Sequence, residues 1–69
     1  MITIFTQSGC GKCKVLKMKL DKKNIHYQIN EDTDYMIKLG FKSTPQLMFD
    51  NGEILDFSAA VEWINNLED

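Results

Sequence analysis

The sequence predicts an α/β domain with the element order β-α-β-α-β-β-α and a mixed four-stranded sheet flanked by helices on both faces. Three observations support this fold class. Two alternating apolar runs enclose an amphipathic helical pattern, and such a β-α-β unit implies a parallel strand pair with a right-handed crossover. A hairpin signal near the C-terminus adds antiparallel strands, and a last helix follows it. Sixty-nine residues leave room for one core, so we expect a single domain over residues 1–69.

The first third of the chain supplies the β-α-β unit. Residues 2–6 alternate and are rich in β-branched side chains, which favours a strand. From residue 12 to residue 23, apolar positions recur at three- and four-residue spacing, which predicts an amphipathic helix with Asn24 as its C-cap. Residues 25–29 alternate Ile, Tyr and Ile with polar residues and predict the second strand.

A short helix and a loop follow. Residues 30–34 read Asn-Glu-Asp-Thr-Asp and offer several N-caps and helix-start acids. We therefore expect a helix that runs through Leu39 and ends at Gly40, because glycine tolerates the backbone that follows a helix. Residues 42–45 are expected to form a loop.

The C-terminal part predicts a hairpin and a helix. Residues 46–49 and 53–57 have strand character, and the Asp-Asn-Gly between them is a strong hairpin signal. Ser58 is expected to cap the last helix. Its apolar face would hold Ala60, Trp63, Ile64 and Leu67.

Composition excludes several classes of function. The net charge of −2 gives no general case for nucleic-acid binding. No apolar run approaches the roughly 18 residues that a membrane span needs, so we expect no membrane association. No basic and apolar leader of an export signal is visible, and we therefore expect a cytoplasmic protein. We also expect it to be a monomer.

Charges are unevenly distributed along the chain. There are eight lysines and no arginine, and six of the lysines fall within residues 12–23, whereas the acids lie almost wholly downstream. A solvated helix face explains this pattern. A positive field around a thiol, directed towards an acidic partner, explains it as well, and the two interpretations are compatible.

The two cysteines, Cys10 and Cys13, are separated by two residues just after the first strand. A structural disulfide is a poor explanation, because closing so short a loop contributes about 2 kcal/mol and joins residues that are already neighbours. Zinc needs four ligands, and His26 is the sole histidine. Two thiolates do suit a soft metal, so a Cu(I) or iron–sulfur binding or carrier module stays as the alternative to a redox centre.

A dithiol redox centre explains the most features. Cys10 would stand where a strand meets a helix, at the positive end of the helix dipole, and Lys12 and Lys14 add positive charge there. These conditions lower the pKa of a cysteine and make it a nucleophile. Cys13 would lie one turn inside on the apolar face and act second, as the resolving thiol.

Glycines and a proline complete the predicted site. Gly9 and Gly11 flank Cys10, and a residue without a side chain lets the backbone of a partner approach closely. Pro45 follows Thr44 at the start of a predicted strand, where proline marks a strand edge or a special turn.

On these residues the chain resembles the thioredoxin-fold family, and within it the small glutaredoxin and NrdH-type redoxin branch. "IFTQSGCGKC" resembles the strand–loop–Cys-x-x-Cys opening, "GFKSTP" the segment before the proline, and "NGEILDFSAAVEWI" the closing hairpin and helix. The resemblance implies a thiol–disulfide oxidoreductase without a resident cofactor or metal. It further implies that Pro45 follows a cis bond and lies against the cysteines, and that the Thr44 backbone pairs with an incoming peptide or glutathione.

The resemblance also implies partners. The substrates would be protein disulfides, with ribonucleotide reductase as one candidate. The reductant would be a flavoprotein similar to thioredoxin reductase, or glutathione as a co-substrate. Glutathione-using members usually carry a basic residue where this chain has Gln7, and a Gly-Gly-acidic stretch where it has residues 56–60. The dipeptide Gly11-Lys12 also differs from the dipeptides that are usual in glutaredoxins and thioredoxins.

Overall fold

The computed structural model describes residues 1–67 and has the predicted element order. The last two residues of the predicted domain therefore lie outside the described residues. No helix in the described part of the chain is long and apolar enough to cross a membrane. The strands are β1 (Ile2–Phe5), β2 (Tyr27–Asn30), β3 (Gln46–Met48) and β4 (Ile54–Leu55). The helices are α1 (Gly11–Lys22), α2 (Thr33–Lys38) and α3 (Phe57–Asn65).

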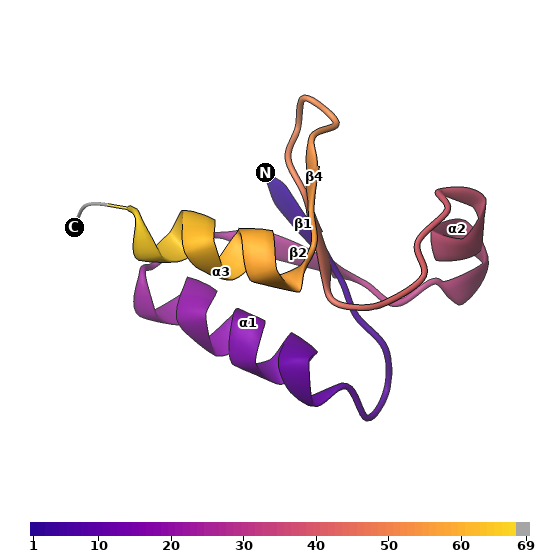
Figure 1. The fold of residues 1–69 in the computed structure, drawn as a ribbon, viewed down its shortest axis with the longest axis horizontal. Helices are drawn as coiled ribbons and strands as arrows, with labels where there is room; N and C mark the ends of the chain where they lie inside the picture. Colours follow the sequence, from indigo (N-terminus) through magenta and orange to yellow (C-terminus); the bar gives the residue numbers. More distant parts are fainter. Residues whose placement is uncertain (68–69) are drawn as a thin grey trace.

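The four strands form one mixed sheet in the order β2-β1-β3-β4. β1 pairs in parallel with β2 and antiparallel with β3, and β3 pairs antiparallel with β4. Figure 1 shows α1 and α3 side by side on one side of the sheet and α2 on the other. The predicted thioredoxin-like fold class is therefore confirmed, including the helices on both faces.

The main core lies between the sheet and the pair α1 and α3. Because successive side chains of a strand point to opposite faces, Ile4 of β1 enters this core while Phe5 points away from it. Each fully buried aliphatic side chain here stabilises the fold by about 1.5–3 kcal/mol. The fully or almost fully buried members are Ile4, Leu16, Leu20, Leu47, Ala60 and Ile64.

A second apolar cluster holds α2 against the other face. The Phe5 ring lies 5.0 Å from the Phe41 ring and 6.0 Å from the Tyr35 ring, centroid to centroid. Met36 is buried beside them with 3% of its surface exposed. β1 is thus covered on both faces, which fixes the strand that leads directly into the cysteine segment.

Both α1 and α2 end as the sequence predicts, with one shift in residue. The C-cap of α1 is Lys23, and Asn24 is the next residue, in a left-handed backbone with φ of 58°. The amide of Asn24 donates to the Asp21 carbonyl and that of Ile25 to the Leu20 carbonyl, both at 3.0 Å. This pair of bonds is a Schellman motif. Gly40, with φ of 83°, ends α2 in the same way.

The start of α3 corrects the sequence prediction. The N-cap is Asp56, whose Oδ1 accepts a hydrogen bond from the Ala59 amide at 2.8 Å, and Ser58 is already helical. The expected strand 53–57 is correspondingly shorter, because Phe57 opens the helix. The predicted hairpin is confirmed: Gly52 has φ of 90° and its amide donates to the Phe49 carbonyl at 2.9 Å.

Candidate active site

Cys10 occupies the N-cap position of α1. Its backbone is extended, with φ of −86° and ψ of 106°, and its amide donates to the Gln7 carbonyl at 3.3 Å. The loop from β1 turns at Gly9, whose φ of 74° is a conformation that residues with a Cβ atom rarely adopt. A Cβ atom built on Gly9 or Gly11 would meet no neighbour within 4 Å, so the approach to Cys10 is open on both sides.

Cys10 and Cys13 are joined by a disulfide, with their Cα atoms 5.3 Å apart. The Cys13 amide also donates a hydrogen bond to Cys10 Sγ at 3.1 Å, so the sulfur takes the place of the usual capping oxygen. Cys13 is buried, with 2% of its surface exposed, whereas Cys10 is partly exposed. One sulfur can therefore meet a partner while the other stays inside the fold.

The segment before β3 brings Thr44 to the cysteines. The Thr44–Pro45 peptide bond is cis, and Pro45 is fully buried. Thr44 Oγ1 lies 3.5 Å from Cys10 Sγ and 3.4 Å from Gln7 Oε1. A hydroxyl has one proton, so Thr44 can donate to one of these acceptors at a time. Thr44 is thus a second donor, besides the Cys13 amide, within reach of the Cys10 sulfur.

An open hollow of about 470 Å³ surrounds the cysteine pair. It brings together four of the predicted site residues, namely Gly9, Cys10, Gly11 and Cys13. It also contains Lys14, which the sequence predicts to add positive charge near Cys10. The remaining residues of the hollow are ones that the sequence does not assign to the site: Thr6, Gln7, Ser8, Lys17 and Glu31.

The position of Glu31 follows from the topology of the sheet. β1 and β2 run in parallel with Phe5 opposite Asn30, and the Thr6 amide donates to the Asn30 carbonyl at 3.0 Å. Since the carboxyl ends of parallel strands meet at one edge of a sheet, the residue after β2 lies beside the loop after β1. The predicted parallel pair therefore already implied that Glu31 would stand near Cys10.

Lys12 is not part of the hollow. Its Nζ lies 5.5 Å from the centroid of the Phe57 ring, so the ammonium group is directed towards α3. The face of an aromatic ring attracts a cation, which explains this position. Lys14 and Lys17 are the lysines that line the hollow itself.

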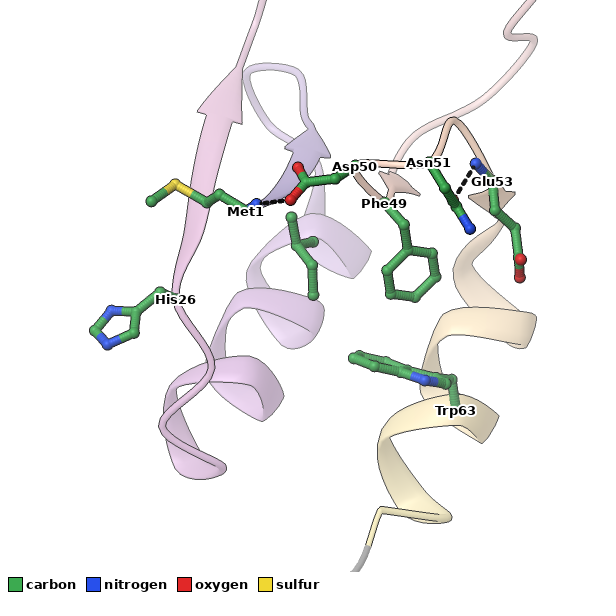
Figure 2. Close-up of a pocket in the computed structure, with 8 residues that line it drawn as sticks. Met1, His26, Phe49, Asp50, Asn51, Glu53 and Trp63 are labelled. Carbon is green, nitrogen blue, oxygen red and sulfur yellow. Dashed lines mark hydrogen bonds and ion pairs between the residues drawn. The ribbon is translucent and has the colours of Figure 1, made fainter.

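A second hollow, of about 600 Å³, lies at the other end of the sheet and offers no comparable chemistry. Figure 2 shows Phe49 and Trp63 facing one another there, and their rings make an edge-to-face contact at 5.0 Å. The N-terminal ammonium group of Met1 is paired with Asp50. His26 is exposed and its ring points away from the other labelled side chains (Figure 2). Within residues 1–67 no group of three or more His, Cys, Asp or Glu side chains could hold a metal ion.

These features define a class of protein. A Cys-x-x-Cys pair at the start of the helix after the first strand, in a β-α-β-α-β-β-α fold with a cis-proline before the third strand, is the arrangement of thioredoxin-fold dithiol proteins. The family model for glutaredoxin matches residues 2–54, from β1 into β4, and the chain belongs to the glutaredoxin family. A search of curated proteins finds no match. Assignment to the NrdH-type branch stays a prediction.

Proposed function

We propose that the protein is a dithiol–disulfide oxidoreductase that reduces protein disulfides, with Cys10 as the nucleophile and Cys13 as the resolving thiol. The observation that carries this proposal is the unequal placement of the two sulfurs. Cys10 is partly exposed, and its Sγ caps α1 and has two hydrogen-bond donors nearby, whereas Cys13 is buried in the first turn. Donors near a sulfur stabilise its thiolate, which is the attacking species.

The reaction starts from the reduced protein. The Cys10 thiolate attacks one sulfur of the substrate disulfide, a bond forms between them, and the other substrate sulfur leaves as a thiolate. The Cys13 thiolate then attacks Cys10 Sγ and releases the first substrate sulfur. Two electrons pass from the protein to the substrate, and the protein is left with the Cys10–Cys13 disulfide. A flavoprotein similar to thioredoxin reductase, or two glutathione molecules, would supply the electrons that restore the dithiol.

Two linked experiments test the proposal. Cys13→Ser, incubated with a protein disulfide, should accumulate a mixed disulfide through Cys10, and Cys10→Ser should accumulate none. Turnover of the wild-type protein is then compared with thioredoxin reductase and NADPH, and with glutathione, glutathione reductase and NADPH. The faster system identifies the class of reductant.

Two outcomes would contradict the proposal. One is a mixed disulfide that forms through Cys13 in the Cys10→Ser variant. The other is copper or an iron–sulfur cluster that stays with the protein purified under reducing conditions, together with no turnover in either reductant system. The second outcome would favour the soft-metal module.

A further inference from the structure

One side of α1 does not pack in the core. The helix buries Cys13, Leu16 and Leu20 against the sheet and α3. On its other side Val15 and Met18 are exposed, with 43% and 64% of their surfaces accessible. We call the surface formed by Lys14, Val15, Met18, Lys19 and Lys22 the basic outer face of α1.

The members of this face are neighbours in space. Val15, Met18, Lys19 and Lys22 follow the spacing i, i+3, i+4 and i+7, which places them along one side of a helix. They line a shallow hollow of about 300 Å³. Two apolar side chains therefore form a small exposed patch that is bordered by ammonium groups.

The charge of this face is strongly one-sided. The only acid between Gly11 and Lys22 is Asp21, whose Oδ1 accepts a hydrogen bond from the Tyr27 hydroxyl at 2.9 Å. Favourable interaction with the helix dipole explains cations in the last turn, such as Lys19 and Lys22. It does not explain Lys14, which lies near the positive end of the helix.

The face is continuous with the active site. Lys14 belongs both to this face and to the hollow around Cys10. With a rise of about 1.5 Å per residue, Lys22 lies about 18 Å along the helix from Cys10. An extended peptide advances about 3.3 Å per residue, so five or six residues beside a substrate cysteine would reach the end of the face.

We propose that the basic outer face of α1 docks an acidic segment of the protein whose disulfide Cys10 attacks, with one apolar side chain of that segment seated against Val15 and Met18. This inference rests on the proposed function and adds a substrate class to it. The surplus of ammonium groups on this face favours a segment that carries carboxylates. The exposed patch of Val15 and Met18 favours an apolar side chain in the same segment. Opposite charges chiefly accelerate encounter and select partners.

Two other classes of occupant fit the face less well. Binding to a lipid surface uses a broad apolar helix face, and here that face is buried in the core, which leaves two exposed apolar side chains. Single-stranded nucleic acids are bound with aromatic stacking and arginine contacts. The face has no aromatic residue and the chain has no arginine.

The test compares two peptides, each joined to a small thiol through a disulfide. The acidic peptide has several Glu and one Leu within five residues on either side of its cysteine, and the neutral peptide has Gln in place of each Glu. The reduced wild-type protein should react about fivefold faster with the acidic peptide at low ionic strength. This preference should disappear in high salt, because salt screens exposed charges.

Variants locate the effect. Lys19→Gln and Lys22→Gln together should remove at least about half of the preference for the acidic peptide. The control is Lys38→Gln on α2, which is compared with Lys19→Gln alone and with Lys22→Gln alone. It removes one positive charge from a different helix and should leave the preference for the acidic peptide unchanged. The reaction with a small uncharged disulfide, bis(2-hydroxyethyl) disulfide, should be the same in all variants.

The outcomes separate this inference from the proposed function. If the small disulfide is not reduced at all, the proposed function fails. Docking is still measured by adding the acidic peptide, without its disulfide, to the Cys10→Ser/Cys13→Ser protein, where amide chemical shifts should change along α1. Equal rates for both peptides, or shift changes outside α1, would overturn the docking proposal. So would a preference that Lys38→Gln lowers as much as Lys19→Gln, or binding to anionic vesicles or DNA without a preference for the acidic peptide.

Discussion

One of the three helices begins differently from the other two, and the difference marks the end of the molecule that carries the cysteine pair. α2 and α3 start at Asp32 and Asp56, and each carboxylate accepts a hydrogen bond from the backbone amide three residues later. α1 starts at Cys10, which makes the same bond with its sulfur. A carboxylate is a strong and inert cap, whereas a sulfur is a weaker cap that can react. The helix without a carboxylate cap is therefore the one that begins with the cysteine pair.

The largest expected effect separates the sulfur cap from the carboxylate caps. Cys10→Ala should lower disulfide exchange to the background rate, because Cys13, the other cysteine of the chain, is buried. Asp56→Ala and Asp32→Ala should keep the wild-type rate, since neither carboxylate lies in the hollow around the cysteines. The rate of reduction of bis(2-hydroxyethyl) disulfide measures all three. Disulfide exchange above the background rate in Cys10→Ala would mean that Cys10 is not the sole reactive sulfur.

The second effect lies within α1. In the reduced protein, limiting iodoacetamide near neutral pH should label Cys10 at least about tenfold faster than Cys13, because Cys13 is buried and Cys10 is not. Mass spectrometry of proteolytic peptides measures the two sites separately. The difference should disappear in denaturant. Faster labelling of Cys13 in the folded protein would reverse the assigned roles.

A smaller effect concerns stability. Asp56→Ala should lower the free energy of unfolding by about 1 kcal/mol, since it leaves the Ala59 amide without its capping acceptor. Ser58→Ala is the matched control, and it should change the free energy by less than about 0.5 kcal/mol, because Ser58 is exposed. Urea denaturation of the oxidised proteins measures both. A larger loss of unfolding free energy in Ser58→Ala than in Asp56→Ala would mean that Ser58 is the N-cap of α3, as the sequence predicts.

The smallest effect is a pH dependence at the other end of α1. Burial, followed by the hydrogen bond to Asp21 and its charge, raises the pKa of Tyr27 above 10.0. A raised pKa favours neutral Tyr27 in the folded state. Its stabilisation is therefore complete below about pH 10 and is lost as the pH rises through the folded-state pKa. Tyrosinate absorbance of Tyr35→Phe, in which Tyr27 is the sole tyrosine, measures this pKa.

Asp21→Asn in the same background sharpens this last test. It removes the charge and weakens the hydrogen bond, so the midpoint of the Tyr27 titration should fall towards the ordinary value. An unchanged midpoint would mean that burial alone sets the pKa.

Most of the fold could be predicted because local signals and tertiary packing agree. The β-branched run at residues 2–5 becomes a central strand, and the spacing of Leu16 and Leu20 matches their burial. Disagreement arises where competing local signals stand close together. Asp56 and Ser58 are both good caps, and the burial of Phe57 against the core accompanies the earlier start of the helix.

The strand at the sheet edge shows a different limit. The alternation of residues 25–29 predicts one apolar face, and Ile25 and Tyr27 do pack against the core. Ile29, on the same edge strand, nevertheless remains 50% exposed. Periodicity gives the direction of a side chain but not whether anything covers it.

Only part of the candidate site could be predicted from the sequence. The cysteine pair could be found from spacing alone, because its residues are neighbours in sequence. Thr44 and Glu31 come to Cys10 from two other segments, and the sheet topology decides their placement. The sequence position of Lys12 predicts that it belongs to the site, whereas its ammonium group lies near the Phe57 ring of α3 and outside the hollow around the cysteines.

The bond from the Cys13 amide to Cys10 Sγ has a consequence for how the oxidation state can be followed. A thiolate accepts a much stronger hydrogen bond than a sulfur that is bonded to another sulfur. This hydrogen bond should therefore be strongest in the reduced protein and weaker whenever Cys10 is bonded to another sulfur. When that sulfur belongs to Cys13, the disulfide itself still holds the first turn of α1 together. The backbone proton of Cys13 is thus a spectroscopic gauge of the charge on its neighbour. Its hydrogen-exchange rate and chemical shift should follow the loss and return of the Cys10 thiolate in the proposed cycle without any added label.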